Sequence, residues 1–296
     1  MKWTIPAKTF FLGEYTALYG GPAIVLTTGP CFQLGLSDST QSTIHPASPA
    51  GKLWEMTQHQ TQLEWLDPYQ GCGGLGASSA QFIGAYLADC YAQDKTPVID
   101  KLLSSYFSCA WNGKGMRPSG YDVIAQGLNE CVFIHRQADQ VQTYPWVFSD
   151  LAFVLIHTNN KMATHEHLQS AQLPNSFTEL DKIVLQAQQA FVNGDAQELI
   201  WAVSAFHRQL LDLNLVAQTT QKLIDNLQQH PQVYAAKGCG ALGADIVLAL
   251  VPAANVEQVR QDFQQQGCRV LATALDLYRK SALFEINPSK TLEISS

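Results

Sequence analysis

The first half of the chain is dominated by short apolar runs separated by glycine and proline. Runs of this kind, rich in β-branched and aromatic residues, predict strands. They cover residues 2–36, 131–134 and 151–156. Residues 42–66 alternate with a period of two, over 42–44, 52–56 and 62–66. This alternation predicts an antiparallel meander.

A helical spacing of apolar residues replaces this pattern at 82–91, after Pro97, and again from residue 176 onward. The later part of the chain predicts helices over 176–194, 199–210, 218–229 and 256–266, with strands at 246–251, 268–272 and 283–286. Helices and strands mixed in this order predict an α+β fold. The character of the chain changes near 155–175, so we expect two domains, at 1–160 and 161–296.

A glycine-rich stretch, Gly71-Cys72-Gly73-Gly74-Leu75-Gly76, leads directly into the helical pattern at Ala77-Ser78-Ser79-Ala80. A helix N-terminus preceded by such a turn binds anions, because unpaired N–H groups and the helix dipole both point at the ligand. No Gly-Lys-Ser/Thr closes the loop, so it is not a Walker loop. The alternative interpretation is a flexible turn before a core helix.

Three charged residues stand out because of their surroundings. Lys8 and Glu14 are the two charges between residues 3 and 37, and they could form a purely structural pair. Asp122 follows a loop rich in glycine and basic residues, which includes Lys114 and Arg117. Asp122 is therefore either the N-cap of a helix or part of a binding loop.

Composition narrows the class of protein. The chain has 296 residues, 18 basic and 25 acidic, and a net charge of −7, which argues against a general nucleic-acid binder. Its seven cysteines form no CxxC pair, so we expect reduced thiols and no zinc site. The N-terminus lacks the apolar region of a signal peptide, and no apolar run reaches membrane-spanning length. We expect a soluble cytoplasmic protein.

Three stretches in order resemble the motifs of the GHMP kinases, a family that includes galactokinase, homoserine kinase, mevalonate kinase and phosphomevalonate kinase. They are residues 6–23, which contain Gly13-Glu14-Tyr15, residues 73–80, and the glycine-rich residues 237–245. Ser119-Gly120-Tyr121-Asp122 matches the segment that holds the catalytic aspartate in the mevalonate and phosphomevalonate kinase branch. Residues 157–164 are similar to the Thr-Gly-x-Lys-x-x-Thr segment of that branch.

This resemblance implies a two-domain GHMP kinase fold, with an N-terminal nucleotide-binding domain and a ferredoxin-like C-terminal domain. It implies ATP and Mg²⁺ as cofactors and a small-molecule substrate, with a catalytic Asp122 assisted by Lys8. The residues expected to hold the ATP phosphates are Gly73, Gly74, Leu75, Gly76, Ala77, Ser78 and Ser79, with Ser79 the first candidate for the Mg²⁺ contact and Ser78 the second. The residues expected to bind the substrate are Glu14, Arg117, Lys161, Gly240 and Ala241.

The chain departs from the family at Trp111, which stands where mevalonate kinases have a Mg²⁺-binding glutamate. We favour mevalonate kinase; phosphomevalonate kinase and a non-catalytic ligand-binding homologue remain as alternatives. A sugar kinase is disfavoured because the galactokinase signature is absent from the first motif. We expect no nucleic-acid or membrane partner, and a monomer or homodimer.

Overall fold

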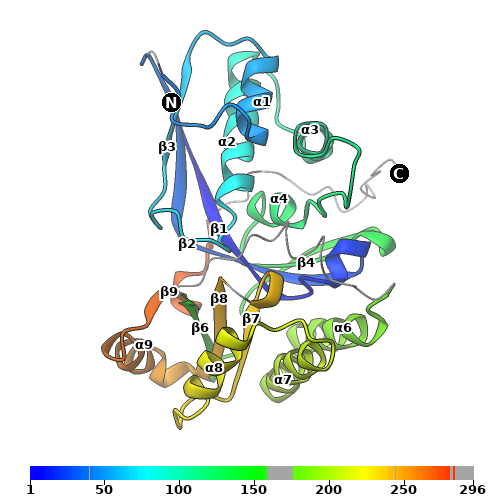
Figure 1. The fold of residues 1–296 in the computed structure, drawn as a ribbon, viewed down its shortest axis with the longest axis vertical. Coiled ribbons are helices and arrows are strands. Elements are labelled where there is room, and N and C mark those ends of the chain that lie inside the picture. Colours follow the sequence, from blue (N-terminus) through cyan, green and yellow to red (C-terminus); the bar gives the residue numbers. More distant parts are fainter. Residues whose placement is uncertain (40, 159–175, 244, 281–282, 284–296) are drawn as a thin grey trace.

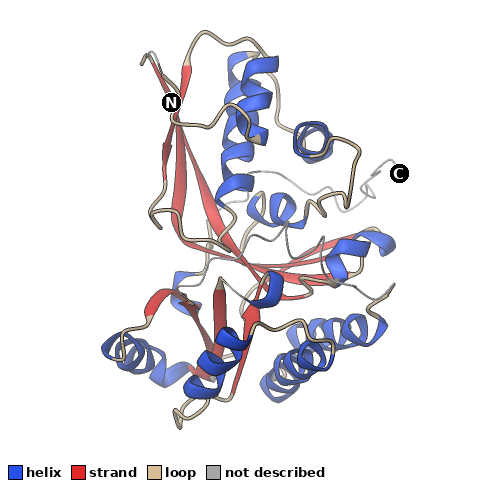
Figure 2. Ribbon diagram, viewed as in Figure 1, coloured by secondary structure: helices blue, strands red, loops and turns tan. Residues whose placement is uncertain are grey.

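The computed structural model describes residues 1–39, 41–158, 176–243, 245–280 and 283. It has two β-sheets, each with its own helices, stacked along the long axis of the molecule (Figure 1). The mixture of helix and strand is clear in both halves (Figure 2). The predicted α+β class is confirmed.

The upper sheet is antiparallel. Its order is β1 (Lys2–Leu12), β2 (Pro22–Ser37), β4 (Cys131–His135) and β5 (Gln140–Tyr144), and β3 (Gln62–Leu66) also pairs with β2. Its helices are α1 (Pro49–Met56), α2 (Ala77–Ala92), α3 (Ile99–Ala110) and α4 (Tyr121–Gln126). Helix α2 packs on β1 and β2 and presents its N-terminus to the middle of the molecule (Figure 1).

The lower sheet is also antiparallel, in the order β7 (Ala235–Cys239), β8 (Ile246–Pro252), β6 (Leu151–His157) and β9 (Arg269–Thr273). Its helices are α6 (Thr178–Asn193), α7 (Ala196–Asp212), α8 (Gln218–Leu227) and α9 (Val256–Gln265). Because β6 belongs to this sheet, we propose that the division between the halves falls before β6, ahead of the expected boundary at residue 160.

The predicted meander over 42–66 is wrong in two of its three strands, because residues 42–44 form no strand and residues 52–56 lie in a helix. Residues 49–56 form helix α1, because Pro49 occupies its first turn and the Ser48 side chain accepts a hydrogen bond from the Gly51 N–H. Leu53 and Trp54 bury one face of this helix. Both the N-cap and the N-terminal proline are helix signals, and they outweigh a short period-two pattern.

Other predicted elements agree with the structure, while β5 and β7 were not predicted. The predicted strand at 283–286 lies almost wholly outside the described residues. Within the described ranges, no helix combines the length and apolar character needed to cross a membrane.

Candidate functional site

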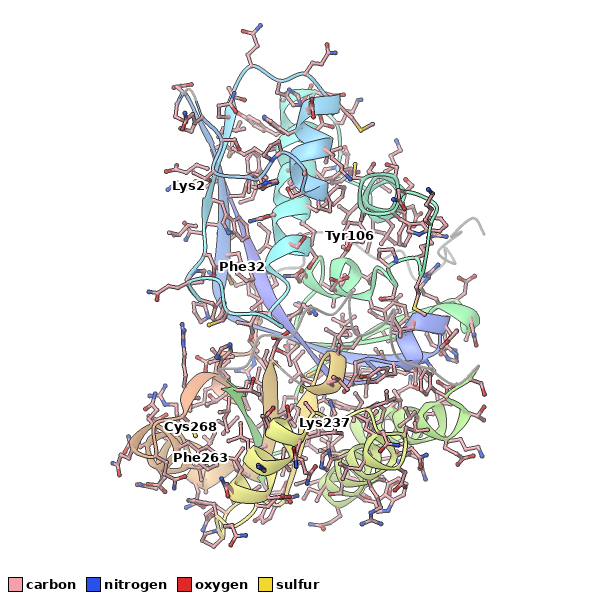
Figure 3. The ribbon with its side chains drawn as sticks, viewed as in Figure 1. Lys2, Phe32, Tyr106, Lys237, Phe263 and Cys268 are labelled. Carbon is pink, nitrogen blue, oxygen red and sulfur yellow. The ribbon has the colours of Figure 1, made fainter. Side chains whose placement is uncertain are left out.

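A cavity of about 470 Å³ lies where the two halves meet. We call it the central pocket. From the upper half, its walls are the glycine-rich loop at 71–78, strand β1, Tyr106 of α3 and the segment that leads into α4. From the lower half, they are the end of β7 and the loop that follows it. Tyr106 and Lys237, labelled in Figure 3, come from these two halves. Its volume is in the range of small-molecule sites.

The glycine-rich loop passes between the side chains of Lys8 and Asp245. A side chain at Gly73 or Gly76 would collide with one of them. A Cβ on Gly76 would lie 2.7 Å from Lys8 Cγ, and a Cβ on Gly73 would lie 2.7 Å from Asp245 Oδ1. Gly76 is the N-cap of α2, with φ +78° and no side-chain cap. The first N–H groups of α2 therefore face the pocket uncapped by a side chain, an arrangement suited to an anion.

The two serines after the loop differ in position. Ser78 lines the central pocket. Ser79 is 2% exposed, and its hydroxyl lies 2.6 Å from Gln126 Oε1 and 3.0 Å from the Gly76 carbonyl oxygen. The contact of Ser79 with Mg²⁺ stays a prediction, and this geometry makes Ser78 the better candidate.

Asp122 lies in the first turn of α4 and lines the central pocket. The N-cap of that helix is Gly120, with φ +76°, so the alternative role of Asp122 as the N-cap is wrong. Lys8, on β1, lines the same pocket. Among the described residues, neither charged group has an oppositely charged partner within 4.0 Å, so both can serve a ligand.

Glu14 lines the pocket, but its charge is paired. Gly13, with φ +99°, turns the chain at the end of β1 so close to Ala23 that a Cβ would lie 2.5 Å from Ala23 Cα. The next residue, Glu14, is thereby directed to the lower half, where its Oε1 lies 2.9 Å from Lys237 Nζ. Burial raises the pKa of Glu14, and the attraction of Lys237 opposes that rise.

Lys237 is fully buried on β7, and no role was predicted for it from the sequence. Beside it, burial raises the pKa of the Cys239 thiol to about 11, against the opposing attraction of Lys237. Cys239 is therefore a neutral thiol at pH 7. Together, Glu14 and Lys237 form an ion pair that joins the two halves behind the pocket.

The loop after β7 is fixed from the upper half as well. The Leu242 N–H donates to the Tyr15 hydroxyl at 2.9 Å. The predicted substrate residues Gly240 and Ala241 line the central pocket. Asp245 also lines it, next to Gly73, although the sequence had suggested no role for this carboxylate.

One predicted substrate residue, Arg117, lies outside the central pocket, and another, Lys161, cannot be placed. Arg117 lies in a second pocket that adjoins it. Lys161 lies outside the described residues. Trp111 Nε1 donates to the Lys114 carbonyl oxygen, and neither residue lines the pocket. Among the described residues that line the central pocket, Ser78, Asp122 and Asp245 have side-chain oxygens of the kind that a hard cation such as Mg²⁺ prefers.

No family model and no curated protein sequence matches the chain. Solved structures do match it over nearly its whole length. Methanococcus jannaschii mevalonate kinase is 15% identical with a TM-score of 0.72, and the match covers 92% of this chain and 97% of that one. Streptococcus pneumoniae phosphomevalonate kinase, in complex with phosphomevalonate and AMPPNP, is 14% identical with a TM-score of 0.74, covering 92% and 99%.

Lactococcus lactis galactokinase, complexed with galactose, is 14% identical with a TM-score of 0.68, covering 95% of this chain and 94% of that one. A homoserine kinase fold from Listeria monocytogenes also matches, with a TM-score of 0.64. All four kinase types that the sequence motifs resemble are thus represented among these structures. The chain has the fold of the GHMP kinases, as its motifs predicted.

Proposed function

We propose that this protein is a kinase that transfers the γ-phosphoryl group of ATP to a hydroxyl of a small molecule in the mevalonate pathway. One observation supports it above the others: the glycine-rich N-terminus of α2 opens into the same pocket as Asp122 and Lys8. Phosphoryl transfer needs the phosphates held, the acceptor oriented and developing charge neutralised. An anion cradle, a carboxylate and an ammonium in one pocket can meet these needs.

In this proposal each group has one task. The loop from Gly73 to Ser78 holds the β- and γ-phosphates through its backbone N–H groups. Asp122 accepts the proton of the acceptor hydroxyl or orients that hydroxyl. Lys8 stabilises the charge that develops on the transferred group.

Mg²⁺ fits the same pocket. Asp245 lies against Gly73 of the phosphate-binding loop, and carboxylate oxygens are ligands that Mg²⁺ prefers. We propose that Ser78 and the carboxylates of Asp122 and Asp245 are the residues that hold it, directly or through water. Bound there, it would neutralise phosphate charge. Asp245 would supply the acidic ligand that is missing at Trp111.

Among the acceptors, we favour mevalonate, with phosphomevalonate as the alternative. Neighbours of both kinds have the same fold as this chain. A coupled assay of ADP release, run with mevalonate, phosphomevalonate, homoserine and galactose, tests the choice. We expect turnover with one of the first two. Nucleotide binding without turnover on any of the four would favour the non-catalytic alternative.

A further inference from the structure

A second cavity, of about 330 Å³, adjoins the central pocket. The two share Leu18, Pro118 and Ser119 in their walls. We call the second cavity the arginine pocket, because Arg117 and Arg136 both line it. Arg117 comes from the loop before α4, and Arg136 follows directly after β4. Of these two arginines, only Arg117 was predicted from the sequence to bind the substrate.

The two guanidinium groups gather around one aromatic ring. Arg117 Cζ lies 3.8 Å from the centroid of the Phe107 ring, and Arg136 Cζ lies 5.7 Å from it. Phe107 belongs to α3, next to Tyr106 of the central pocket. Cation–π attraction to the ring helps to hold both guanidinium groups near each other, and a guanidinium can bind a planar or tetrahedral anion through paired N–H groups.

Their positive charges are not neutralised within the described parts of the chain. Neither arginine has a carboxylate within 4.0 Å there, and the Nε of each is buried without a hydrogen-bond partner. The Arg136 side chain donates from Nη1 to the Ser119 carbonyl oxygen at 3.0 Å. Burial and the nearby charge of Arg117 lower the pKa of Arg136, offset in part by Tyr121. Two like charges held together in this way are stabilised by a bound anion.

We propose that Arg117 and Arg136 form an oxyanion subsite that holds the carboxylate of the phosphoryl acceptor, at the end of the molecule away from the oxygen that is phosphorylated. This inference rests on the proposed function. Pro118 and Ser119 separate the two pockets, and Asp122 follows shortly along the same segment. An acceptor anchored at the arginines therefore extends past Ser119 and brings its hydroxyl toward Asp122. The subsite selects acceptors that have an anionic group at one end.

Asp139 is the acidic residue of this pocket among the described residues, and it lies at its exposed edge. Its carboxylate lies more than 4.0 Å from either guanidinium. It opposes a second negative charge on the ligand. Asp139→Asn should therefore strengthen the binding of an anion at the arginines, and phosphate should gain more than acetate because it has more charge.

Direct anion binding tests the subsite without ATP or acceptor. Inorganic phosphate and acetate are titrated into the full chain by calorimetry at low ionic strength. We expect Arg117→Gln and Arg136→Gln each to weaken binding about tenfold or more, as expected for the loss of a charged hydrogen bond. The matched control is Arg208→Gln, an exposed arginine on α7 that lines neither pocket. It should leave the affinity unchanged.

Arg136 could also act only by holding the Ser119 carbonyl in place. That structural role predicts a lower thermal stability and a lower kcat for Arg136→Gln, with phosphate affinity intact, and this result would overturn the subsite. The subsite predicts a higher KM for the acceptor with kcat within about threefold. If Arg136→Gln does not fold, Arg136→Lys and Arg117→Gln take its place in these measurements. Lysine keeps the positive charge at residue 136 but cannot make the paired hydrogen bonds of a guanidinium.

Competition identifies the source of the anion. Mevalonate or phosphomevalonate should displace the phosphate whose binding requires the two arginines, and AMPPNP should displace only phosphate bound at the glycine-rich loop. Displacement of the arginine-dependent phosphate by AMPPNP alone would mean that the arginines serve the nucleotide, and no displacement by either acceptor would mean an independent anion; both results contradict the proposal. Unchanged phosphate affinity in the Arg117→Gln, Arg136→Gln double variant would also overturn it, whatever the turnover assay shows. Conversely, phosphate binding that requires both arginines, in a chain without kinase activity, would refute the proposed function alone.

Discussion

Asp122 lines the pocket from a helix that does not need it for capping, because Gly120 is the N-cap of α4. Asp122→Asn should therefore leave the thermal stability near that of the wild type. If the carboxylate accepts or orients the acceptor proton, kcat should fall roughly 10²–10⁴-fold. Steady-state kinetics and a thermal melt of the same preparation measure the two effects together.

Nucleotide binding provides the internal control for this variant. The ATP phosphates are expected at the glycine-rich loop, so the ATP affinity of Asp122→Asn should stay close to the wild-type value. A well-folded variant that turns over at more than about a tenth of the wild-type rate would exclude acid–base catalysis by Asp122.

Several predicted site residues were marked by a local pattern in the sequence, and the structure places them in one pocket, while their roles stay predictions. Asp122, Lys8 and the glycine-rich loop all lie around one pocket, as expected. Lys237 and Arg136 were missed, because their importance depends on partners brought near by the fold. Lys237 meets Glu14 from the other half, and Arg136 meets Arg117 across the Phe107 ring. Nothing in the local sequence around either residue indicates these encounters.

Among the elements, the turn into α2 gives the most direct test of the phosphate site. In Gly76→Ala, the new Cβ would crowd Lys8 Cγ and Gln126 Nε2 at 2.7 and 3.0 Å, and alanine is strained at φ +78°. We expect ATP affinity to fall about tenfold or more, because the loop must shift from the geometry that binds phosphate. Calorimetric titration with Mg²⁺-ATP measures the change.

Gly194 offers a matched control for the backbone strain. It ends α6 at φ +67°, and no atom lies within 4 Å of the position of its Cβ. Gly194→Ala should cost about 1–2 kcal/mol of stability, like any alanine in this conformation, and should leave ATP affinity intact. An equal loss of affinity in both variants would show that the effect at Gly76 is a general loss of stability.

Element types followed from apolar periodicity where the elements were long. Helices α2, α6, α7 and α9 lie close to the predicted ranges. The error at α1 arose in a short segment, where a period-two pattern and a helical one share several positions. Strand β7 was missed because Ala235–Cys239 contains a buried lysine and a glycine, which do not resemble an apolar strand.

At the scale of the whole molecule, the Glu14–Lys237 pair links stability to pH. Lys237→Met leaves Glu14 buried without its counter-charge, which should cost about 3–5 kcal/mol near pH 7. Without the lysine, the pKa of Glu14 rises further above its ordinary value of 4.5. The folded state then holds a proton that the unfolded state releases, so the stability of the variant falls as pH rises above about 4.5.

Urea unfolding of wild type and Lys237→Met, from pH 5 to pH 8, measures this dependence. The gap in unfolding free energy between them should narrow at pH 5 and widen at pH 8. The double variant Glu14→Gln, Lys237→Met has no carboxyl group at residue 14, so it should lose less stability between pH 5 and pH 8 than Lys237→Met does. A constant gap in the single variant would show that Glu14 is not the group that titrates.

The same ion pair bears on how the chain could be divided. A cut between β5 and β6 separates the two sheets, but it places Glu14 and Tyr15 on one fragment and Lys237 and Leu242 on the other. Each fragment would then expose a charged group and an apolar surface that the other normally covers. Neither fragment is expected to be stable by itself, and the two should recover ATP binding when mixed. This protein is thus a candidate for a split reporter, in which recovered ATP binding shows that the two fragments have associated.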